Sequence, residues 1–382
     1  MSRRLRVALV TSSYNHIADG VALTLNRLVG YLQSVGVEVL VVAPVAREAA
    51  FAHKGELAPA PSTPLPFRPE YRLTLGLTSA LRRRLEAFAP DIVHIATPDV
   101  LGHQALAFGR TMGAAVVASY HTRYETYLKD YGLKFLEDFV AARLRSFYGA
   151  CDEVYAPSAS MANSLIADGF ADNIAVWGRG VDTQRFDPAR RSAAFRATIG
   201  AADGTPVIAF VGRLVREKRL DTLAGVMEGL RDVAHLPLIV GDGPDRSMLQ
   251  RAAPGAVFTG FLDGDELAVA YASSDIFLFP SDTETFGAVT LEAMASGLPA
   301  VCADATGSRC LVSEGVTGFL APAGDIDAFV AATRTLAGDA ERRTRMGAAA
   351  RARSLGFSWE ADMAGLLTRY EALVRGPRRA VA

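Results

Sequence analysis

Short apolar runs and helix-like periodicities alternate along most of the chain. In the first half, apolar runs predict strands at 6–13, 37–44, 91–96, 115–122 and 152–157. The helical patterns between them include 21–35, 77–88 and 133–150. Strands that are apolar on both faces are typical of parallel sheets covered by helices. We therefore expect a doubly wound α/β domain with its binding sites at the carboxyl ends of the strands.

A second series of strands begins near the middle of the chain. It includes apolar runs at 206–212, 238–240, 257–260, 276–280 and 299–303. The polar stretch between the two series suggests a linker at 187–204, which separates a domain at 1–186 from a second at 205–356. The tail, 357–382, contains an amphipathic helix, and the segment 59–69 holds five prolines and is predicted to be a loop.

Composition narrows the functional classes. The 382 residues include 40 Lys and Arg against 41 Asp and Glu, so the basic excess of a dedicated nucleic-acid binder is absent. The three cysteines form no C-x-x-C pair, which argues against structural zinc and fits a reducing, cytoplasmic setting. No apolar run approaches the roughly 18 residues that span a bilayer. The short apolar stretch near the start is read as a strand rather than an export signal.

Two glutamates follow the strand that ends at Pro280. Glu284 lies in the predicted turn, and Glu292 lies about two helical turns further on. Unpaired amide groups at the helix start favour an anion there. One carboxylate could then bind a sugar hydroxyl and the other a ribose diol. Taken singly, each glutamate is better explained as a cap or a solvated helix residue, whereas the whole stretch 280–299 favours the functional interpretation.

Two cations follow the glycine turn at Gly212. Arg213 and Lys218 flank a predicted helix start, where a cation opposes the helix dipole unless an anion binds. Together they could hold a diphosphate and stabilise it as it leaves. We interpret Arg216 and Arg219 as surface residues.

These stretches resemble the retaining family 4 glycosyltransferases, whose GT-B fold has two facing Rossmann-like domains and a C-terminal helix that returns to the first. The resemblance covers essentially the whole chain. It rests on the glutamates eight residues apart, on Gly212-Arg213 with Lys218, and on the segments that begin at Gly241, Gly260, Tyr271 and Gly315. The segment that begins at Trp177 is similar to a subgroup of lipid glycosyltransferases and bacterial mannosyltransferases.

The resemblance implies roles for individual residues. Glu284 would contact the donor sugar, Glu292 the ribose, and Arg213 and Lys218 the diphosphate. The remaining donor-site residues implied by the motifs are Gly20, Gly212, Gly241, Phe261, Leu262, Thr285, Phe286 and Gly287.

The first domain is expected to bind the acceptor. Gly20 lets the backbone come close to a phosphate, and Asp19 is either a helix N-cap or a contact to sugar or acceptor. Tyr120 and His121 close a strand; the resemblance implies an active-site histidine here, although a lone histidine can also be structural. Arg179 is a further acceptor-side candidate.

Two further sequence features each allow two interpretations. Asp263-Gly264-Asp265 looks like a metal-binding D-x-D motif but precedes a helix, where aspartates cap, so we expect no required metal. Arg82, Arg83 and Arg84 lie on the predicted helix 77–88 and form either a solvated face or a contact to an anionic membrane.

We therefore expect a metal-independent retaining enzyme that moves a hexose from a UDP- or GDP-linked sugar to an acceptor hydroxyl. The acceptor is a membrane lipid, which would put the enzyme on the inner face of the cytoplasmic membrane, or a soluble glycan or small molecule. An epimerase or hydrolase on the same fold is the nearest alternative. A sugar-binding protein without catalysis is the other. The donor base, the donor sugar and the oligomeric state stay open.

Overall fold

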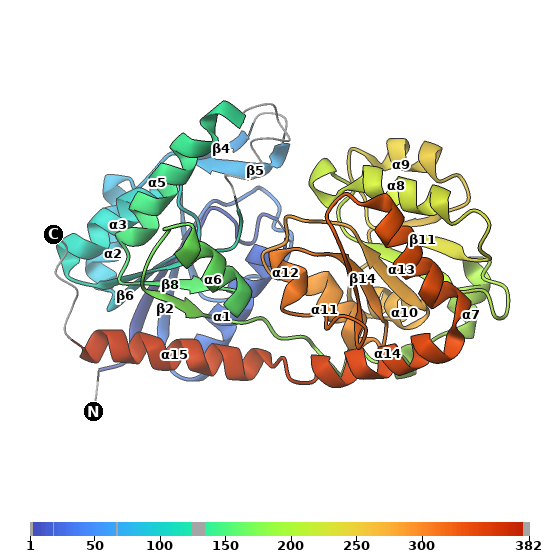
Figure 1. Cartoon of the computed structure of the whole chain (residues 1–382). Helices are drawn as coiled ribbons and strands as arrows, with labels where there is room; N and C mark the ends of the chain where they lie inside the picture. Colours follow the sequence, from blue (N-terminus) through green and yellow to red (C-terminus); the bar gives the residue numbers. More distant parts are fainter. Residues whose placement is uncertain (1–2, 18, 66–67, 124–133, 377–382) are drawn as a thin grey trace. The chain divides into compact units, whose positions relative to one another are not determined.

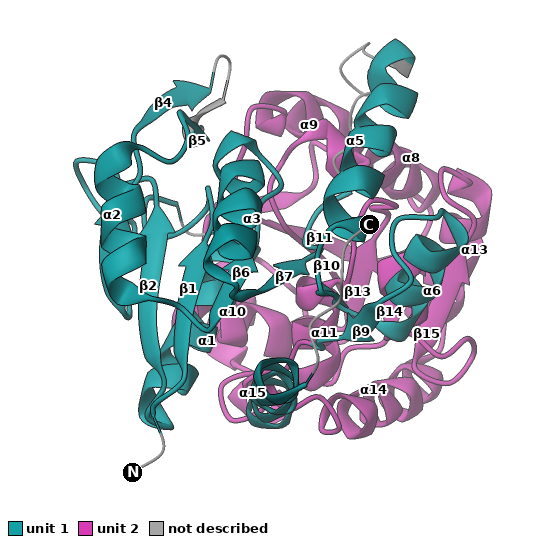
Figure 2. Cartoon of the chain, turned by 90° about the vertical axis from the view of Figure 1, so that its left-hand side faces the viewer, with its two compact units in different colours: residues 1–125, 135–178, 360–382 teal, residues 126–134, 179–359 magenta. Residues whose placement is uncertain are grey.

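The chain forms two compact α/β units, shown in Figure 1 as a computed structural model that describes residues 3–17, 19–65, 68–123 and 134–376. The first unit contains residues 1–125, 135–178 and 360–382, and the second is built mainly from 179–359 (Figure 2). Each unit is organised around a parallel sheet, as the alternating apolar pattern predicts.

The first sheet has seven strands in the order β3-β2-β1-β6-β7-β8-β9. The strands are β3 (Glu56–Pro59), β2 (Glu38–Ala43), β1 (Arg6–Val10), β6 (Ile92–Ile95), β7 (Ala115–Ser119), β8 (Glu153–Ala156) and β9 (Ile174–Val176). The helices of this unit are α1 (Gly20–Ser34), α2 (Ser79–Phe88), α3 (Val100–Met112), η2 (Lys134–Leu136), α5 (Glu137–Gly149), α6 (Ala159–Ala167) and α15 (Trp359–Arg375). All the strands pair in parallel, and β1 lies between β2 and β6, where the direction of winding reverses.

The second sheet has six strands in the order β12-β11-β10-β13-β14-β15. The strands are β12 (Val257–Gly260), β11 (Leu236–Val240), β10 (Val207–Val211), β13 (Ile276–Phe279), β14 (Ala300–Ala303) and β15 (Gly318–Ala321). The helices are η3 (Pro188–Arg190), α7 (Ala193–Thr198), η4 (Arg216–Lys218), α8 (Leu220–Gly229), α9 (Arg246–Ala252), α10 (Gly264–Ala272), α11 (Ala288–Ala295), α12 (Thr306–Arg309), α13 (Ile326–Gly338) and α14 (Ala340–Ser354). The winding reverses between β10 and β13, and sites in open α/β sheets lie at such switch points.

The proline-rich segment 59–69 is not a simple loop. Its described part contributes to an antiparallel hairpin of β4 (Ser62–Leu65) and β5 (Arg68–Thr74). Proline lacks an amide hydrogen. A strand that is paired on one side only tolerates proline where that position faces away from its partner strand. The hairpin is a separate two-stranded sheet, which explains how it accommodates the prolines.

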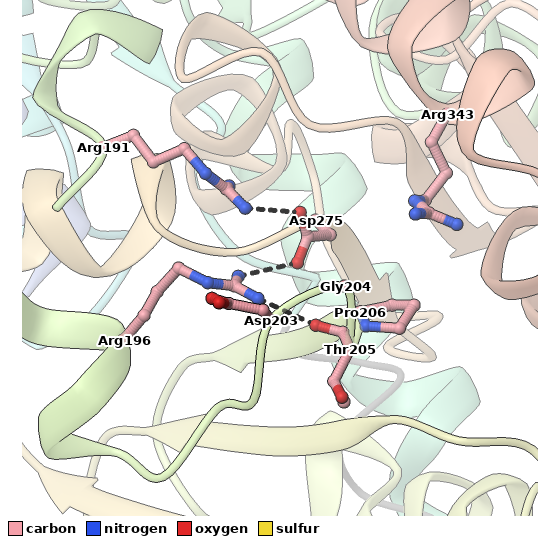
Figure 3. Close-up of a pocket in the computed structure, with 8 residues that line it drawn as sticks. All are labelled: Arg191, Arg196, Asp203, Gly204, Thr205, Pro206, Asp275 and Arg343. Atoms are coloured by element: carbon pink, nitrogen blue, oxygen red, sulfur yellow. Dashed lines mark hydrogen bonds and ion pairs between the residues drawn. The ribbon is translucent and has the colours of Figure 1, made fainter. Parts of the chain in front are cut away.

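Residues 187–204, expected to be a linker, belong to the second unit. Arg191 and Arg196 each bind one carboxylate oxygen of Asp275, at 2.8 and 2.9 Å (Figure 3). Arg196 also donates to the carbonyl of Ser273 at 2.9 Å, just after α10. A polar stretch resembles a linker in sequence, but here its guanidinium groups bind carbonyl and carboxylate oxygens of the packed unit.

These arginines border a cavity of about 370 Å³ at the amino ends of β10 and β13. Asp203, Thr205 and Arg343 complete its polar rim (Figure 3). Because Arg191 and Arg196 are already bound to Asp275, we interpret this cavity as part of the packing of 187–204, at the edge of the sheet opposite to the candidate site.

A buried histidine holds the C-terminal helix α15 to the first unit. His94 is fully buried, with its Nδ1 hydrogen-bonded to the Tyr370 hydroxyl and its Nε2 to the Ser119 hydroxyl. Arg369, on the same helix, forms a two-pronged ion pair with Glu153. The tail is thus helical, and from Glu360 onward it is part of the first unit.

Candidate active site

The loops that follow β10 and β13 carry the main cluster of charged candidates. Arg213 and Lys218 follow β10, and Glu284 follows β13. The two strands are direct neighbours in the sheet, with Ile208 paired to Ile276. The fold therefore brings residues 66 positions apart to one edge, as expected for a binding site at the switch point.

Lys218 and Glu284 form an ion pair. The lysine ammonium contacts the Oε1 atom of the glutamate, and the Ser281 hydroxyl donates to the same oxygen at 3.2 Å. Both side chains are about one-fifth exposed, and the ammonium lies 5.6 Å from the centre of the Phe279 ring. The pair is thus accessible to a ligand, yet sheltered enough for its charges to interact strongly.

Arg219 is not the surface residue that the sequence suggested. Its Nε and Nη2 atoms donate to the two carboxylate oxygens of Asp282, at 2.9 and 2.8 Å. The pattern of charges along the chain could not indicate this pair, because the two residues are 63 positions apart. The other cation interpreted as a surface residue, Arg216, is indeed exposed.

The glycine-rich loop after β11 packs directly on the loop after β10. Gly241 lies so close that a Cβ atom there would be 1.9 Å from the Gly212 carbonyl oxygen. A Cβ at Gly243 would lie 2.4 Å from the Leu214 carbonyl oxygen. These glycines are required by close backbone approach, which also fixes the path of the chain toward Lys218.

Two other donor-site candidates follow β12. Phe261 is 69% exposed, whereas Leu262 is partly buried against the core of the second unit. An exposed aromatic ring at the carboxyl edge of a sheet is available to stack on a planar base.

Helix α11 begins beside Glu284. Gly287 is its N-cap residue, with φ +93°, and Phe286 before it is buried against Phe357. Thr285 completes the turn between Glu284 and the helix. The sequence placed the helix start near 285–287, and the structure places it at Ala288.

Glu292 lies in this helix and is oriented by a buried tyrosine. The Tyr271 hydroxyl lies 3.2 Å from one carboxylate oxygen of Glu292 and 3.1 Å from the Val289 carbonyl oxygen. Burial and the neighbouring carboxylate raise the pKa of Tyr271 well above its usual value, so the phenol stays a donor. The contact could not be read from the sequence, although Tyr271 lies in one of the quoted motifs.

Asp263 and Asp265 lie at the start of α10. Asp263 occupies the N-cap position, but its side chain makes no capping hydrogen bond. Asp265 pairs with Arg190 at 3.2 Å. Within the described ranges, no three His, Cys, Asp or Glu side chains are arranged to hold a metal ion.

In the first unit, Asp19 is the N-cap of α1. One carboxylate oxygen accepts from the Ala22 amide at 2.8 Å, and the other accepts from the Ser13 hydroxyl at 3.0 Å. The capping alternative is therefore realised. Gly20 is the first residue of the helix, and a Cβ there would meet no atom within 4 Å, so its backbone borders open space.

The two candidates after β7 differ in exposure. Tyr120 is fully buried and packs against Tyr148 and Phe170, so it belongs to the core and not to an acceptor surface. An aromatic residue at a strand end can lie in the core or on a binding surface, and the sequence alone does not show which. His121 is half-buried, with its ring 6.1 Å from that of Trp177.

Arg179 belongs to the second unit and has 6% of its surface exposed. The sequence predicted an acceptor contact for Arg179. So little of the side chain is exposed that the structure gives no support to this role.

The three arginines of α2 do not form one uniform charged face. Leu81 and Leu85 are buried, as the periodicity predicts. Arg84 pairs with Glu56, and the Arg82 guanidinium lies 5.9 Å from the centre of the Phe108 ring. All three arginines are exposed, and Arg82 and Arg84 would have to give up these contacts to bind an outside partner.

Comparison with known proteins agrees with this geometry. Residues 18–185 match the model of Glycosyltransferase Family 4, and residues 205–339 match that of Glycosyl transferases group 1. The chain is 38% identical over 380 residues to a GDP-mannose-dependent alpha-mannosyltransferase of Mycobacterium tuberculosis, covering 98% of each chain. It is 35% identical to the sulfoquinovosyl transferase SQD2 of Arabidopsis thaliana, with 94% of this chain and 71% of that protein covered.

A more distant relative and a solved structure extend the comparison. A GDP-mannose-dependent alpha-(1-6)-phosphatidylinositol dimannoside mannosyltransferase of Mycobacterium tuberculosis is 29% identical, with 98% of each chain covered. The structure of sucrose-phosphate synthase from Thermosynechococcus elongatus superposes with a TM-score of 0.79 at 20% identity, covering 97% of this chain and 99% of that one. This last likeness supports the fold alone.

Proposed function

The chain belongs to glycosyltransferase family 4 and has the GT-B fold of hexosyltransferases, and on this basis we propose which residues bind and activate its donor. The donor is a nucleotide-diphosphate hexose, bound at the carboxyl ends of β10 and β13. The observation that carries the proposal is the Lys218–Glu284 ion pair at this switch point. It places a cation and a carboxylate side by side, where a phosphate and a sugar hydroxyl would need them.

Each group has a distinct task in this proposal. Lys218 and Arg213 bind the diphosphate and stabilise its charge as it departs. The amides of 285–287 at the start of α11 add partial positive charge. Glu284 orients the sugar. Glu292, with one oxygen held by Tyr271, accepts from the ribose hydroxyls.

Retention follows from the proposed geometry of attack. The acceptor hydroxyl approaches the anomeric carbon on the face from which the diphosphate leaves, and the departing phosphate takes the hydroxyl proton. His121, on the acceptor side, would contact the sugar or the acceptor. No carboxylate is assigned as a covalent nucleophile. Proton NMR of fresh product from an α-linked donor should show an α linkage, and a β linkage would contradict the assignment.

GDP-mannose is the donor to test first, because a relative at 38% identity is named for it. UDP-linked sugars are the alternative. A thermal-shift comparison of GDP-mannose, UDP-glucose and ADP-glucose should single out one donor, since a ligand that binds the native state raises the melting temperature by mass action. Lys218→Ala should abolish that shift. Equal shifts in wild type and variant would refute the assignment of the phosphate site.

We propose a lipid acceptor, supported by the relative named as a phosphatidylinositol dimannoside mannosyltransferase. In the described part of the chain no helix is long and apolar enough to cross a membrane. Contact with an anionic surface through α2 would use its three exposed arginines, of which Arg82 and Arg84 also contact Phe108 and Glu56. A soluble acceptor is the alternative, and transfer to extracted lipid against transfer to a free glycan separates the two.

We further propose that turnover needs no metal. Asp265, half of the D-x-D motif, is paired with Arg190, and Arg213 and Lys218 would supply positive charge to the diphosphate instead. Activity should survive excess EDTA. Loss of activity that Mg²⁺ or Mn²⁺ restores would return the motif to consideration. An epimerase would instead alter the donor sugar when no acceptor is present.

A further inference from the structure

We propose that Arg219 and Asp282 are positioning residues, whose ion pair sets the distance between Lys218 and Glu284. The proposal rests on the donor site described above and deepens it. Neither residue is expected to touch the donor. Their effect would pass through the two loops that carry the reacting charges.

The first observation is the backbone of Arg219. Its φ and ψ of 55° and 50° are left-handed, and among the described residues only Ala89 shares a positive φ without being glycine. This conformation is unfavourable for a residue with a Cβ atom. Residues held in this way persist where surrounding contacts over-determine them, and they concentrate at functional sites.

The second observation is what holds Arg219 there. Both prongs of its guanidinium meet Asp282, at 2.9 and 2.8 Å, and the side chains are only 25% and 18% exposed. Two parallel hydrogen bonds fix direction as well as distance. A lysine could supply the charge but not this geometry.

The third observation is a second tie on the other side of Lys218. The Glu217 carbonyl accepts from the Thr283 hydroxyl at 3.2 Å, and the Ser281 hydroxyl, which it shares with Glu284, also lies 3.2 Å from this carbonyl oxygen. The residues on either side of Lys218 are therefore both bonded to the segment 281–283, which leads directly to Glu284. The Lys218–Glu284 contact lies within this braced pair of loops.

A purely structural ion pair would give a different result from a positioning pair. Arg219→Gly removes the guanidinium but also removes the steric cost of the left-handed backbone. If the pair only stabilises the fold, this variant should keep its turnover. If the pair aligns Lys218 with Glu284, turnover should fall although the protein remains folded.

The experiment compares Arg219→Gly, Arg219→Lys, Asp282→Asn and the double variant Arg219→Gly with Asp282→Asn. The matched control is Arg216→Gly, which removes an exposed arginine from η4, the short helix that Arg219 follows directly. Kinetics use whichever of GDP-mannose, UDP-glucose and ADP-glucose stabilises the wild-type protein, with a membrane-lipid extract as acceptor. Release of nucleoside diphosphate gives kcat and KM, and thermal unfolding is recorded for each variant.

We expect kcat to fall about tenfold in Arg219→Gly, with KM for the donor changed less than threefold and the melting temperature little changed. The double variant should be no worse than the more impaired single variant, because coupled residues are not additive. Arg216→Gly should match wild type. Wild-type kcat in folded Arg219→Gly and Asp282→Asn would overturn the proposal, as would additive losses.

Lys218→Ala and Glu284→Ala distinguish this failure from failure of the donor site itself. If they lose turnover while the Arg219 and Asp282 variants do not, the site stands and the positioning role is wrong. If Lys218→Ala and Glu284→Ala both keep wild-type turnover, the site assignment is wrong, and the positioning proposal falls with it.

Discussion

In the second unit, the loops after β10 and β13 are tied together by charged side chains, whereas in the first unit the loops after β1 and β7 rest on a helix cap and on aromatic packing. Lys218–Glu284 and Arg219–Asp282 cross between the two loops of the second unit. In the first unit, Asp19 is engaged in capping α1 and Tyr120 is buried.

The two units differ in which side chains their strand-end loops leave to bind a substrate. The second unit presents partly exposed charges that are already oriented, which suits a diphosphate of fixed geometry. The first unit uses most of its polar candidates for its own structure. Changes at Asp19 and Tyr120 should therefore affect mainly stability, and changes at Lys218 and Glu284 should affect mainly turnover.

The largest effect is expected at the ion pair of the second unit. Lys218→Ala should lower kcat/KM on the order of 10²- to 10³-fold, as loss of one oriented group at a developing charge typically does. Arg213→Ala should lower it about 10²-fold. Arg216→Ala is the control and should stay near wild type. Near-native rates in folded Lys218→Ala and Arg213→Ala would contradict the view that the charged loops of the second unit carry the catalytic groups.

The next effect is on stability and lies in the first unit. Tyr370→Phe removes the hydroxyl that pairs with His94 and leaves a buried ring nitrogen without that bond. The free energy of unfolding, measured by urea denaturation, should fall by about 1–3 kcal/mol. Thr368→Ala, exposed on the same helix, should stay within about 0.5 kcal/mol of wild type. An equal loss in both variants would mean that the buried bond contributes nothing specific.

A smaller change separates the two interpretations of Asp19. Asp19→Ala should cost about 1 kcal/mol of unfolding free energy, because the Ala22 amide loses its capping partner. Asp19→Ser keeps a capping oxygen and should recover most of that stability. If it also recovers kcat/KM, capping is the whole role. Restored stability with activity still lost would assign Asp19 a further contact to substrate.

The smallest effect is expected at α2. Each arginine near an anionic surface can contribute about 1 kcal/mol, roughly fivefold in partitioning. Because Arg82 and Arg84 have partners within the protein, Arg83→Ser alone should account for most of the loss seen in the triple Ser variant. Co-sedimentation with phosphatidylserine vesicles at low salt measures it. Wild type and the triple variant that sediment alike would refute membrane contact through α2.

The sequence by itself determined the two parallel sheets and the approximate position of most strands, because apolar runs buried on both faces leave a strong local signal. It also indicated Lys218, Glu284 and Glu292, since strand ends and helix starts are local features that anions recognise. The glycines of the loop after β11 were indicated by the resemblance to family 4 glycosyltransferases.

Only the tertiary structure decided which of these residues contact each other and which have a purely structural role. It assigned Arg219 to Asp282, Tyr271 to Glu292 and His94 to Tyr370, and it placed Tyr120 in the core. It also assigned 187–204 to the second unit and formed a hairpin in a proline-rich segment. Hydrophobic periodicity records which face of an element is buried but not which distant polar group it meets, because such partners depend on how strands are ordered in the sheet.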